Sequence, residues 1–257
     1  MLAVPFVLLG YSAFQNLFWL AALTIAMKLY FGNGRLALLL LWVTFALSPL
    51  VPYEILVGSD RIANSVYVLL SVLWMIWAIS KADLPSWKSV LPAVFLGISL
   101  ASRANFLMLL PLIFSAMVKS AGWKTASKLA VITGTTILIL TLPFYFYDPQ
   151  AFAPLYAAGK LGQFEPVLPF AGILVPAVTG IIALILAFLQ LATGKPDALL
   201  RNCAIVLALP VLCGIILFSV RIGRPSFGFA SYGTFFLFFG AVAFWRGLFA
   251  GTALEVA

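Results

Sequence analysis

The sequence predicts an all-α protein, a polytopic bundle of transmembrane helices. Of its 257 residues, 64% are hydrophobic and only 9% are charged, and the mean hydropathy is +1.16. In a soluble domain roughly one quarter of the residues are charged. Long apolar blocks recur from one end of the chain to the other, whereas a membrane β-barrel has short segments of alternating hydrophobicity. We therefore expect a single integral membrane domain over residues 1–257.

The apolar blocks give the expected order of the membrane segments. A helix of about 20 apolar residues crosses a hydrocarbon core of about 30 Å. The blocks lie near residues 4–27, 36–57, 65–80, 89–102, 105–118, 127–147, 167–192, 202–220 and 227–249. Two of them, 89–102 and 105–118, have only 14 residues each, about 21 Å of helix. We expect about eight or nine membrane segments, with a short helical pair or a re-entrant hairpin at 89–118.

The stretch Leu91–Val118 decides which face of the membrane each later loop occupies. Arg103 lies in its middle, so the stretch is either one helix with a buried arginine or two arms that meet at a polar elbow, Ser102–Asn105. If the chain returns at the elbow, ten of the 15 lysines and arginines share one face. If it crosses once, the remaining bases divide seven to seven and Arg103 is buried. The positive-inside rule favours the return, with the ten bases in the cytoplasm.

The opposite face carries the first group of candidate site residues, Asp60, Arg61 and Asn64. A carboxylate at a membrane boundary can act as a general base, and an adjacent arginine can bind an anionic headgroup with two hydrogen bonds. The alternative is a polar loop in which Asp60 caps the helix that begins near Ala63. Glu54 is a second acid on this face.

Two further groups of arginines lie on the same face. Arg103, with Asn105, would line a cavity or meet a partner, or else extend to the membrane surface from a helix end. Arg221 and Arg224 could hold a phosphate or pyrophosphate, or form an ordinary basic loop at the interface. Positive charge on the disfavoured face calls for a local reason, and an anionic ligand supplies one.

The remaining acids and the missing residue types narrow the chemistry. Asp148 and Glu165 each precede a proline, which predicts turns, with binding of sugar hydroxyls as the alternative. The chain has no histidine, and both cysteines, Cys203 and Cys213, lie in one apolar block, so we expect neither a zinc site nor a histidine base. The bases are spaced singly between apolar blocks, so we expect no nucleic-acid partner.

Several short motifs resemble those of the GT-C glycosyltransferases, particularly the bacterial mannosyltransferase-like group that uses polyprenyl-phosphate sugars. They cover roughly residues 3–155. The motifs are Ala3-Val4-Pro5-Phe6, Ser48-Pro49 before Gly58-Ser59-Asp60, Gly97 to Arg103 leading into Leu110-Pro111, and Leu142-Pro143-Phe144 followed by Asp148 to Phe152. In that family the catalytic acid lies in the first large loop, just after the first span, whereas here no acid precedes Glu54. We therefore expect the chain to be the C-terminal part of a longer GT-C-like architecture, or a relative with a different catalytic acid.

The resemblance implies transfer of a sugar from a polyprenyl-phosphate donor to a glycan, lipid or protein acceptor, at the outer face of a bacterial inner (plasma) membrane. Asp60 is then the expected base, with Glu54 in reserve, and Arg61, Arg103, Arg221 and Arg224 are the expected phosphate ligands. We expect no organic cofactor, and the sequence leaves a divalent metal open. The alternatives are a transporter or flippase of lipid-linked saccharides and a non-catalytic membrane scaffold.

Overall fold

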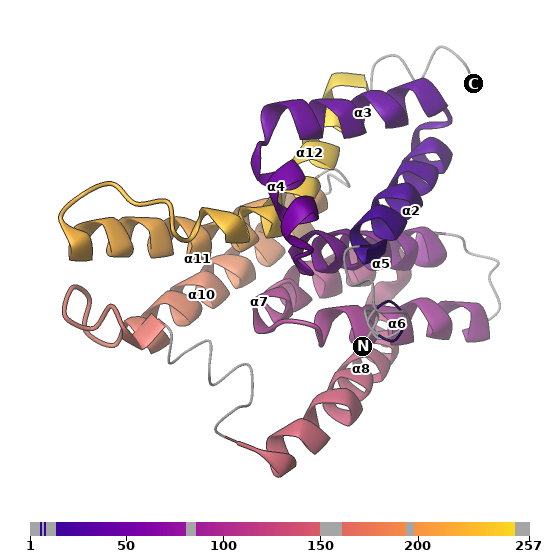
Figure 1. Ribbon diagram of the computed structural model, residues 1–257. Helices are drawn as coiled ribbons and strands as arrows, with labels where there is room; N and C mark the ends of the chain where they lie inside the picture. The colour runs from indigo at the N-terminus through magenta and orange to yellow at the C-terminus, as the bar shows by residue number, and fades with distance from the viewer. Residues whose placement is uncertain are drawn as a thin grey trace.

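The protein is a bundle of helices in the computed structural model (Figure 1). The structure describes residues 14–80, 86–149, 161–193 and 198–249, together with Phe6 and Leu8, so two of the motifs above lie partly outside it, at residues 3–5 and 150–152. Within the described residues every regular element is helical. The elements are α2 (Phe14–Phe31), α3 (Gly34–Leu47), α4 (Leu50–Val57), α5 (Arg61–Ser80), α6 (Ser86–Leu100), α7 (Ala104–Leu107), α8 (Leu110–Tyr147), α10 (Ala171–Thr193), α11 (Ala198–Ile222), the 3-10 helix η1 (Ala230–Gly233) and α12 (Thr234–Phe249).

The number of helices that could cross a membrane is smaller than the sequence predicts. In the described part of the chain five helices are long and apolar enough, or six if the bent pair α3–α4 counts as one span. The expected eight or nine segments are not reached, because α6 and α12 have only 15 and 16 residues, about 22 and 24 Å of helix. In addition, the blocks 105–118 and 127–147 are joined at a bend at Gly122, and the whole stretch Ala104–Tyr147 counts as one of the five long helices. The architecture is that of a multi-pass helical membrane protein.

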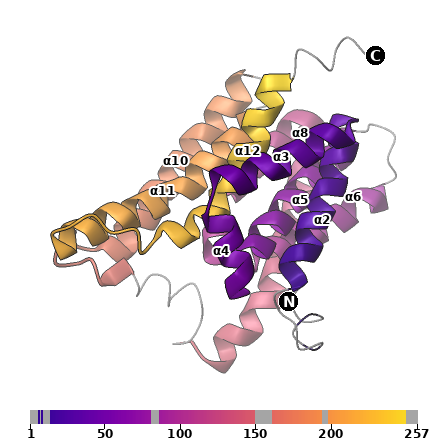
Figure 2. The same ribbon diagram turned by 45° about the horizontal axis from the view of Figure 1, so that its top comes forward.

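Helix α5 is the centre of the bundle. In α5, 67% of the most apolar 18-residue stretch is buried, whereas the same stretch is only 17–28% buried in the other four long helices. Helices α2, α6, α8 and α12 all pack against it (Figures 1 and 2). The residues just before α5 are therefore held in place by several helices at once.

Helices α3 and α4 form a broken segment that leads back to the start of α5. Their axes differ by 89°. Ser48, between them, has an extended backbone, which is the conformation favoured for a residue that precedes proline, here Pro49. The bend turns α4 toward α5 (Figure 1). It thereby carries Glu54 to the first turn of α5.

The elbow expected at Ser102–Asn105 is a real interruption of the helices. Helix α6 ends at Leu100, and Arg103 has an extended backbone ahead of α7. The rings of Trp74 in α5 and Phe95 in α6 lie 5.6 Å apart. Because Arg103 also contacts the residue before α5, as described below, α5 and α6 run in opposite directions and the elbow lies beside the start of α5.

Helix α8 is sharply bent at Gly122. This glycine has φ 76° and ψ 165°, outside the helical region, a conformation that residues with a Cβ rarely adopt. The rings of Phe114 and Trp123 are 5.5 Å apart, although nine residues of straight helix would separate them by about 13 Å. Beyond the bend, the Thr133 hydroxyl donates to the Ala93 carbonyl at 3.1 Å. The second part of α8 therefore lies along α6.

Gly97 allows the close approach of these two helices. A Cβ at this position would lie 2.6 Å from Cβ of Thr136 and 2.8 Å from the Thr133 carbonyl oxygen. Gly97→Ala should therefore lower the free energy of unfolding by about 1–3 kcal/mol, the usual cost of overpacking. Gly134→Ala is the matched control, because a Cβ there meets nothing within 4 Å and alanine favours helix by up to about 1 kcal/mol. Unfolding in mixed detergent micelles measures both, and equal stability of the two variants would contradict tight packing of α6 on α8.

Helices α10 and α11 lie side by side and extend past α4 and α5 (Figures 1 and 2). A buried polar network joins them to α8. Gln190 donates through Nε2 to the Ser115 hydroxyl at 3.0 Å and to the Leu112 carbonyl at 3.2 Å. Asn202 of α11 donates in turn to Oε1 of Gln190 at 3.3 Å. Buried amides of this kind fix the register of apolar helices, which otherwise slide past one another at little cost.

Candidate functional site

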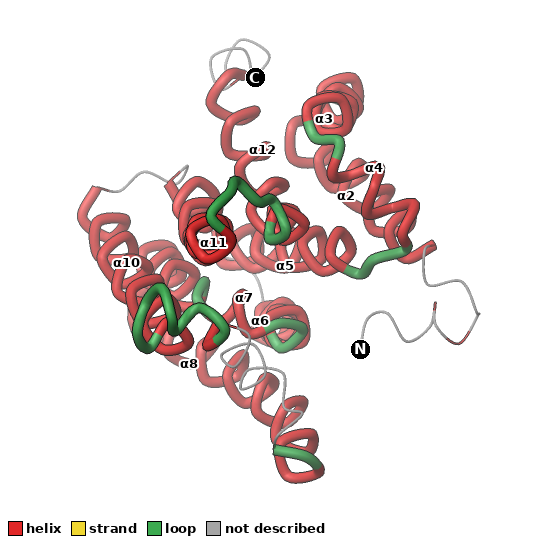
Figure 3. The backbone as a smooth tube through the Cα atoms, turned by 60° about the vertical axis from the view of Figure 1, so that its left-hand side comes forward, coloured by secondary structure: helices red, strands yellow, loops and turns green. Residues whose placement is uncertain are grey.

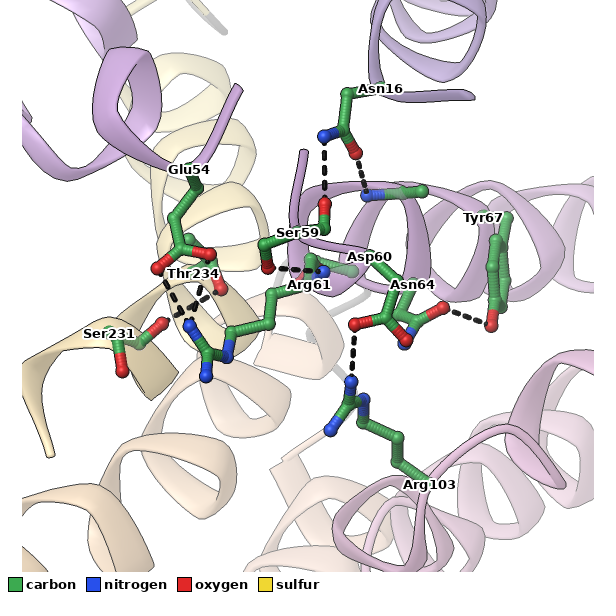
Figure 4. Close-up of polar contacts among 12 residues, drawn as sticks. Asn16, Glu54, Ser59, Asp60, Arg61, Asn64, Tyr67, Arg103, Ser231 and Thr234 are labelled. Carbon is green, nitrogen blue, oxygen red and sulfur yellow. Dashed lines mark hydrogen bonds and ion pairs between the residues drawn. The ribbon is translucent and has the colours of Figure 1, made fainter. Parts of the chain in front are cut away.

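Two ion pairs lie together where α4 and α6 meet the start of α5 (Figure 4). Arg61 donates through one nitrogen, Nη1, to both carboxylate oxygens of Glu54, at 2.8 and 3.1 Å. Arg103, at the elbow, donates through Nη2 to Oδ1 of Asp60 at 2.5 Å. One pair joins residues 7 apart in the sequence and the other joins residues 43 apart. Together they make one charge-balanced cluster, which we call the paired-charge site (Glu54, Asp60, Arg61, Arg103).

The turn between α4 and α5 is built around Gly58. Gly58 has a left-handed backbone, φ 70° and ψ 24°, as is usual for the residue that ends a helix. Its N–H and that of Ser59 donate back to the Ile55 and Glu54 carbonyls, both at 3.1 Å. The chain can therefore reverse within three residues and place Glu54 and Arg61 next to each other.

Asp60 precedes α5, yet its side chain does not cap that helix. The N–H of Ala63 donates instead to Oδ1 of Asn16, in α2, at 3.2 Å, and the N–H of Arg61 donates to the Ser59 hydroxyl at 3.2 Å. Asn16 also donates to the Ser59 carbonyl at 2.7 Å. Because α2 supplies the cap, the carboxylate of Asp60 is available to Arg103. The alternative role expected for Asp60, a helix cap, is thus carried out by Asn16 and Ser59.

Asn64 holds the other oxygen of Asp60. Its Nδ2 donates to Oδ2 of Asp60 at 3.0 Å, and its own Oδ1 accepts from the Tyr67 hydroxyl at 2.6 Å. The Tyr67 ring packs against Trp19 of α2 with a centroid separation of 5.4 Å. Both oxygens of Asp60 are therefore positioned, one by an arginine and one by an amide that is itself fixed.

Both arginines lie over aromatic rings from the C-terminal part of the chain. The guanidinium carbon of Arg61 is 4.9 Å from the centroid of the Tyr232 ring, in η1, and that of Arg103 is 5.5 Å from Phe235, in α12. Cation–π contacts of this kind contribute about 0.5–2 kcal/mol each. The rings also keep the two guanidiniums from turning away from the carboxylates.

Exposure separates the two acids. The side chain of Glu54 is 0% exposed and that of Asp60 48%, while Arg61 and Arg103 are 27% and 30% exposed. A molecule from solvent can therefore reach Asp60 and both arginines, but it cannot reach Glu54. A guanidinium has five N–H donors, and Nε of Arg103 is buried without a hydrogen-bond partner in the described structure. A ligand from solvent cannot reach this buried Nε, but the exposed part of the guanidinium can donate to a further anionic oxygen while Nη2 stays bonded to Asp60.

The other expected site residues do not join this cluster. Asn105 is next to it in the chain, within α7, and its carbonyl accepts from the Met108 N–H at 3.3 Å. Asp148 follows the end of α8 and is exposed, as is Glu165 in the turns before α10. Asp148 and Glu165 thus lie on segments other than those that carry the two ion pairs.

Arg221 and Arg224 lie farther along the bundle. Arg221 reaches the side-chain oxygen of Gln163 at 3.5 Å, and both arginines are exposed. The Phe229 ring packs on α11 at Gly214, where a Cβ would meet it at 2.8 Å. Phe229 is followed directly by η1, and Tyr232 of η1 contacts Arg61. The paired-charge site therefore lies near the level of Gly214. Arg221 is seven residues farther along α11, which is about 10 Å at 1.5 Å per residue. Figure 3 shows the loop after α11 and the elbow after α6 as separate green segments.

The described residues contain no group of three or more His, Cys, Asp or Glu side chains that could hold a metal ion. Comparison of the chain with protein-family models, curated proteins and solved structures finds no match. The chemistry of the site has to be argued from its own residues.

Sequence reasoning missed four participants in the site, Asn16, Tyr67, Tyr232 and Phe235. Asn16 could have been found, because the polar pair Gln15-Asn16 interrupts an apolar block. The structure shows that both side chains are buried. Tyr232 and Phe235 gave no signal, because aromatic residues are common throughout the chain.

Proposed function

We propose that the protein is a membrane glycosyltransferase of the GT-C type. It would transfer a sugar from a polyprenyl-phosphate donor to a hydroxyl of a glycan, lipid or protein acceptor, on the outer face of a bacterial inner membrane. The motif resemblance over residues 3–155 motivates the family, and the paired-charge site supports the chemistry.

One observation carries the proposal: a half-exposed carboxylate, Asp60, is held beside two partly exposed arginines at the end of a membrane helix. A general base must keep its proton-accepting oxygen within reach of the substrate. The developing charge on a leaving phosphate is stabilised by donors that are already in position. Asp60 meets the first requirement, and Arg103 and Arg61 meet the second.

In the proposed reaction the acceptor oxygen forms a bond to the anomeric carbon of the sugar. The bond between that carbon and the phosphate oxygen breaks, and its electron pair goes to the polyprenyl phosphate. Asp60 accepts the proton of the acceptor hydroxyl, and Arg103 neutralises the leaving phosphate through the N–H groups that it does not use for Asp60. Glu54 is buried and neutralised by Arg61, so we assign it a positioning role. We do not assign Arg221 and Arg224 to the reacting centre.

The distribution of charge supports the outer face. Helix α2 begins at the site, where Asn16 contacts Ser59, and ends about 18 residues later at the turn that carries Lys28 and Arg35. Ala93 of α6 contacts Thr133, and Gly97 contacts Thr136, so the second part of α8 runs in the same direction as α6. The three lysines on either side of the Gly122 bend therefore lie at the end where α6 begins, away from the site. They are Lys119, Lys124 and Lys128. The richly basic end faces the cytoplasm under the positive-inside rule.

A transfer assay tests the function. Vesicles that contain the purified protein, a polyprenyl phosphate bearing a tritiated sugar, and a bacterial membrane extract as the source of acceptor should lose label from the lipid phosphate and gain it in a new product. The same vesicles without the protein provide the background. If the label crosses the bilayer while still attached to its lipid phosphate, the protein is a transporter and the proposal is wrong.

A further inference from the structure

The corner between α2 and α3 is a second place where charge and shape combine, far from the paired-charge site. The two helices converge at the turn of residues 32–33 (Figure 1). Between them lies an open hollow of about 620 Å³, lined by Thr24, Ile25, Lys28, Asn33, Arg35 and Leu38. This volume is within the range of small-molecule sites.

Two positively charged side chains, Lys28 and Arg35, line this hollow, and no carboxylate among the described residues lines it. Neither the Lys28 side chain nor that of Arg35 forms an ion pair within the described part of the chain. Moreover, the sequence contains no acid before Glu54, so neither α2 nor α3 can supply one. Gly34 lets the Lys28 side chain lie over the start of α3, because a Cβ at Gly34 would be 3.7–3.8 Å from three of its carbons. Lys28 and Arg35 are thereby directed to the same hollow.

The walls of the hollow continue into apolar surface. Ile25 and Leu38 line it and are 62% and 51% exposed, and Trp42, one turn beyond Leu38 on α3, is 72% exposed. Residues spaced by three or four on a helix share a face, so Leu38 and Trp42 form a strip that leads away from Arg35. Exposed apolar strips on a membrane helix are covered by acyl chains.

We infer that the α2–α3 corner binds an anionic phospholipid, with the headgroup phosphate between Lys28 and Arg35 and the acyl chains along the apolar strip. The side chain of arginine can donate two hydrogen bonds to one phosphate, and lysine supplies a compact second charge. Basic pockets at helix junctions on the cytoplasmic side are suited to anionic headgroups. The inference does not depend on the proposed reaction, because the corner is at the other end of α2 from Asn16 and Asp60.

Native mass spectrometry of the full chain in detergent tests this site. Dioctanoyl phosphatidylglycerol and dioctanoyl phosphatidylcholine are added at equal concentration, and bound copies of each are counted. The wild type should retain phosphatidylglycerol in clear preference. Lys28→Gln and Arg35→Gln should each weaken its binding about fivefold, and the double variant about thirtyfold. Each single variant removes one of the two positive charges that attract the anionic phosphate, and the double variant removes both.

The control is the pair Lys124→Gln and Lys128→Gln, which removes two exposed bases from the same end of the bundle but not from the hollow. This control should retain the wild-type preference. Equal binding of the two lipids by the wild type, or an equal loss in the control, overturns the assignment. Inorganic phosphate at millimolar concentration should not displace phosphatidylglycerol, and displacement would show that the hollow takes a free phosphate and not a lipid.

Discussion

Asp60→Asn is expected to reduce sugar transfer by about a hundredfold to ten-thousandfold, the usual contribution of a general base. Asparagine has nearly the same shape and keeps an oxygen that can accept from Arg103 or Asn64. It cannot, however, take up the proton of the acceptor hydroxyl. The fold should therefore persist while the reaction is lost. The transfer of tritiated sugar from polyprenyl phosphate, measured in vesicles with equal amounts of inserted protein, gives the rate.

Asp148→Asn is the matched control for this variant. It makes the same chemical change in an exposed acid at the end of α8, outside the paired-charge site. It should retain transfer within about twofold. If Asp60→Asn keeps the wild-type rate, Asp60 is not the base. If both variants lose activity equally, the effect comes from the overall charge of this face.

The arrangement of the site explains why Asp60 is preferred to Glu54, a choice that the sequence alone could not justify. Both acids lie near the start of the same helix, and both have an arginine partner. The difference is burial, since Glu54 has no exposed surface and Asp60 keeps nearly half of its own. That difference arises because α4 folds back under α5 and because Asn16 of α2 takes over the cap. The first effect depends on the tight turn at Gly58, and the second is a tertiary contact with a segment that is distant in the sequence.

Composition and hydropathy were sufficient to predict a multi-pass helical bundle, because long apolar blocks without charges have few other folded solutions. The interruption at Ser102–Asn105 was also predicted, because the count of bases on the two faces favours a chain that returns there. The predicted count of eight or nine segments is not supported, since five or six of the described helices are long and apolar enough to cross a membrane. The short length of α6 was visible in the block 89–102, but hydropathy averages do not reveal how the blocks on either side of Gly122 are joined.

The membership of the site was predictable only in part. Charge counting assigns a residue to a face of the membrane, but it contains no information on depth along a helix. Arg61 and Arg221 therefore looked equivalent in the sequence, although α11 continues well past the level of the ion pairs and carries Arg221 away. The pairing of Asp60 with Arg103 could be anticipated only as membership of the same face.

Arg61→Met is expected to cause the largest loss of stability, about 3–5 kcal/mol in the free energy of unfolding. Removing one partner of a buried ion pair leaves the other charge without compensation, and Glu54 has no exposed surface through which water could replace the guanidinium. Methionine retains much of the apolar contact with Tyr232, so the loss reports mainly on the charge. Unfolding in mixed micelles of a mild detergent and SDS provides the measurement. Arg221→Met, at an exposed arginine bonded only through its contact with Gln163, should change stability by no more than about 0.5 kcal/mol.

A second substitution separates the positioning role of Glu54 from a role of Arg61 in the reaction. Glu54→Gln combined with Arg61→Met removes the unpaired charge, so most of the lost stability should return. If Arg61 also helps to hold the donor phosphate, this stable double variant should still transfer sugar more slowly than the wild type. Recovery of both stability and transfer would restrict Arg61 to holding α4 against α5 and leave Arg103 as the phosphate ligand. A double variant as unstable as Arg61→Met alone would contradict the premise that Glu54 is charged and depends on Arg61.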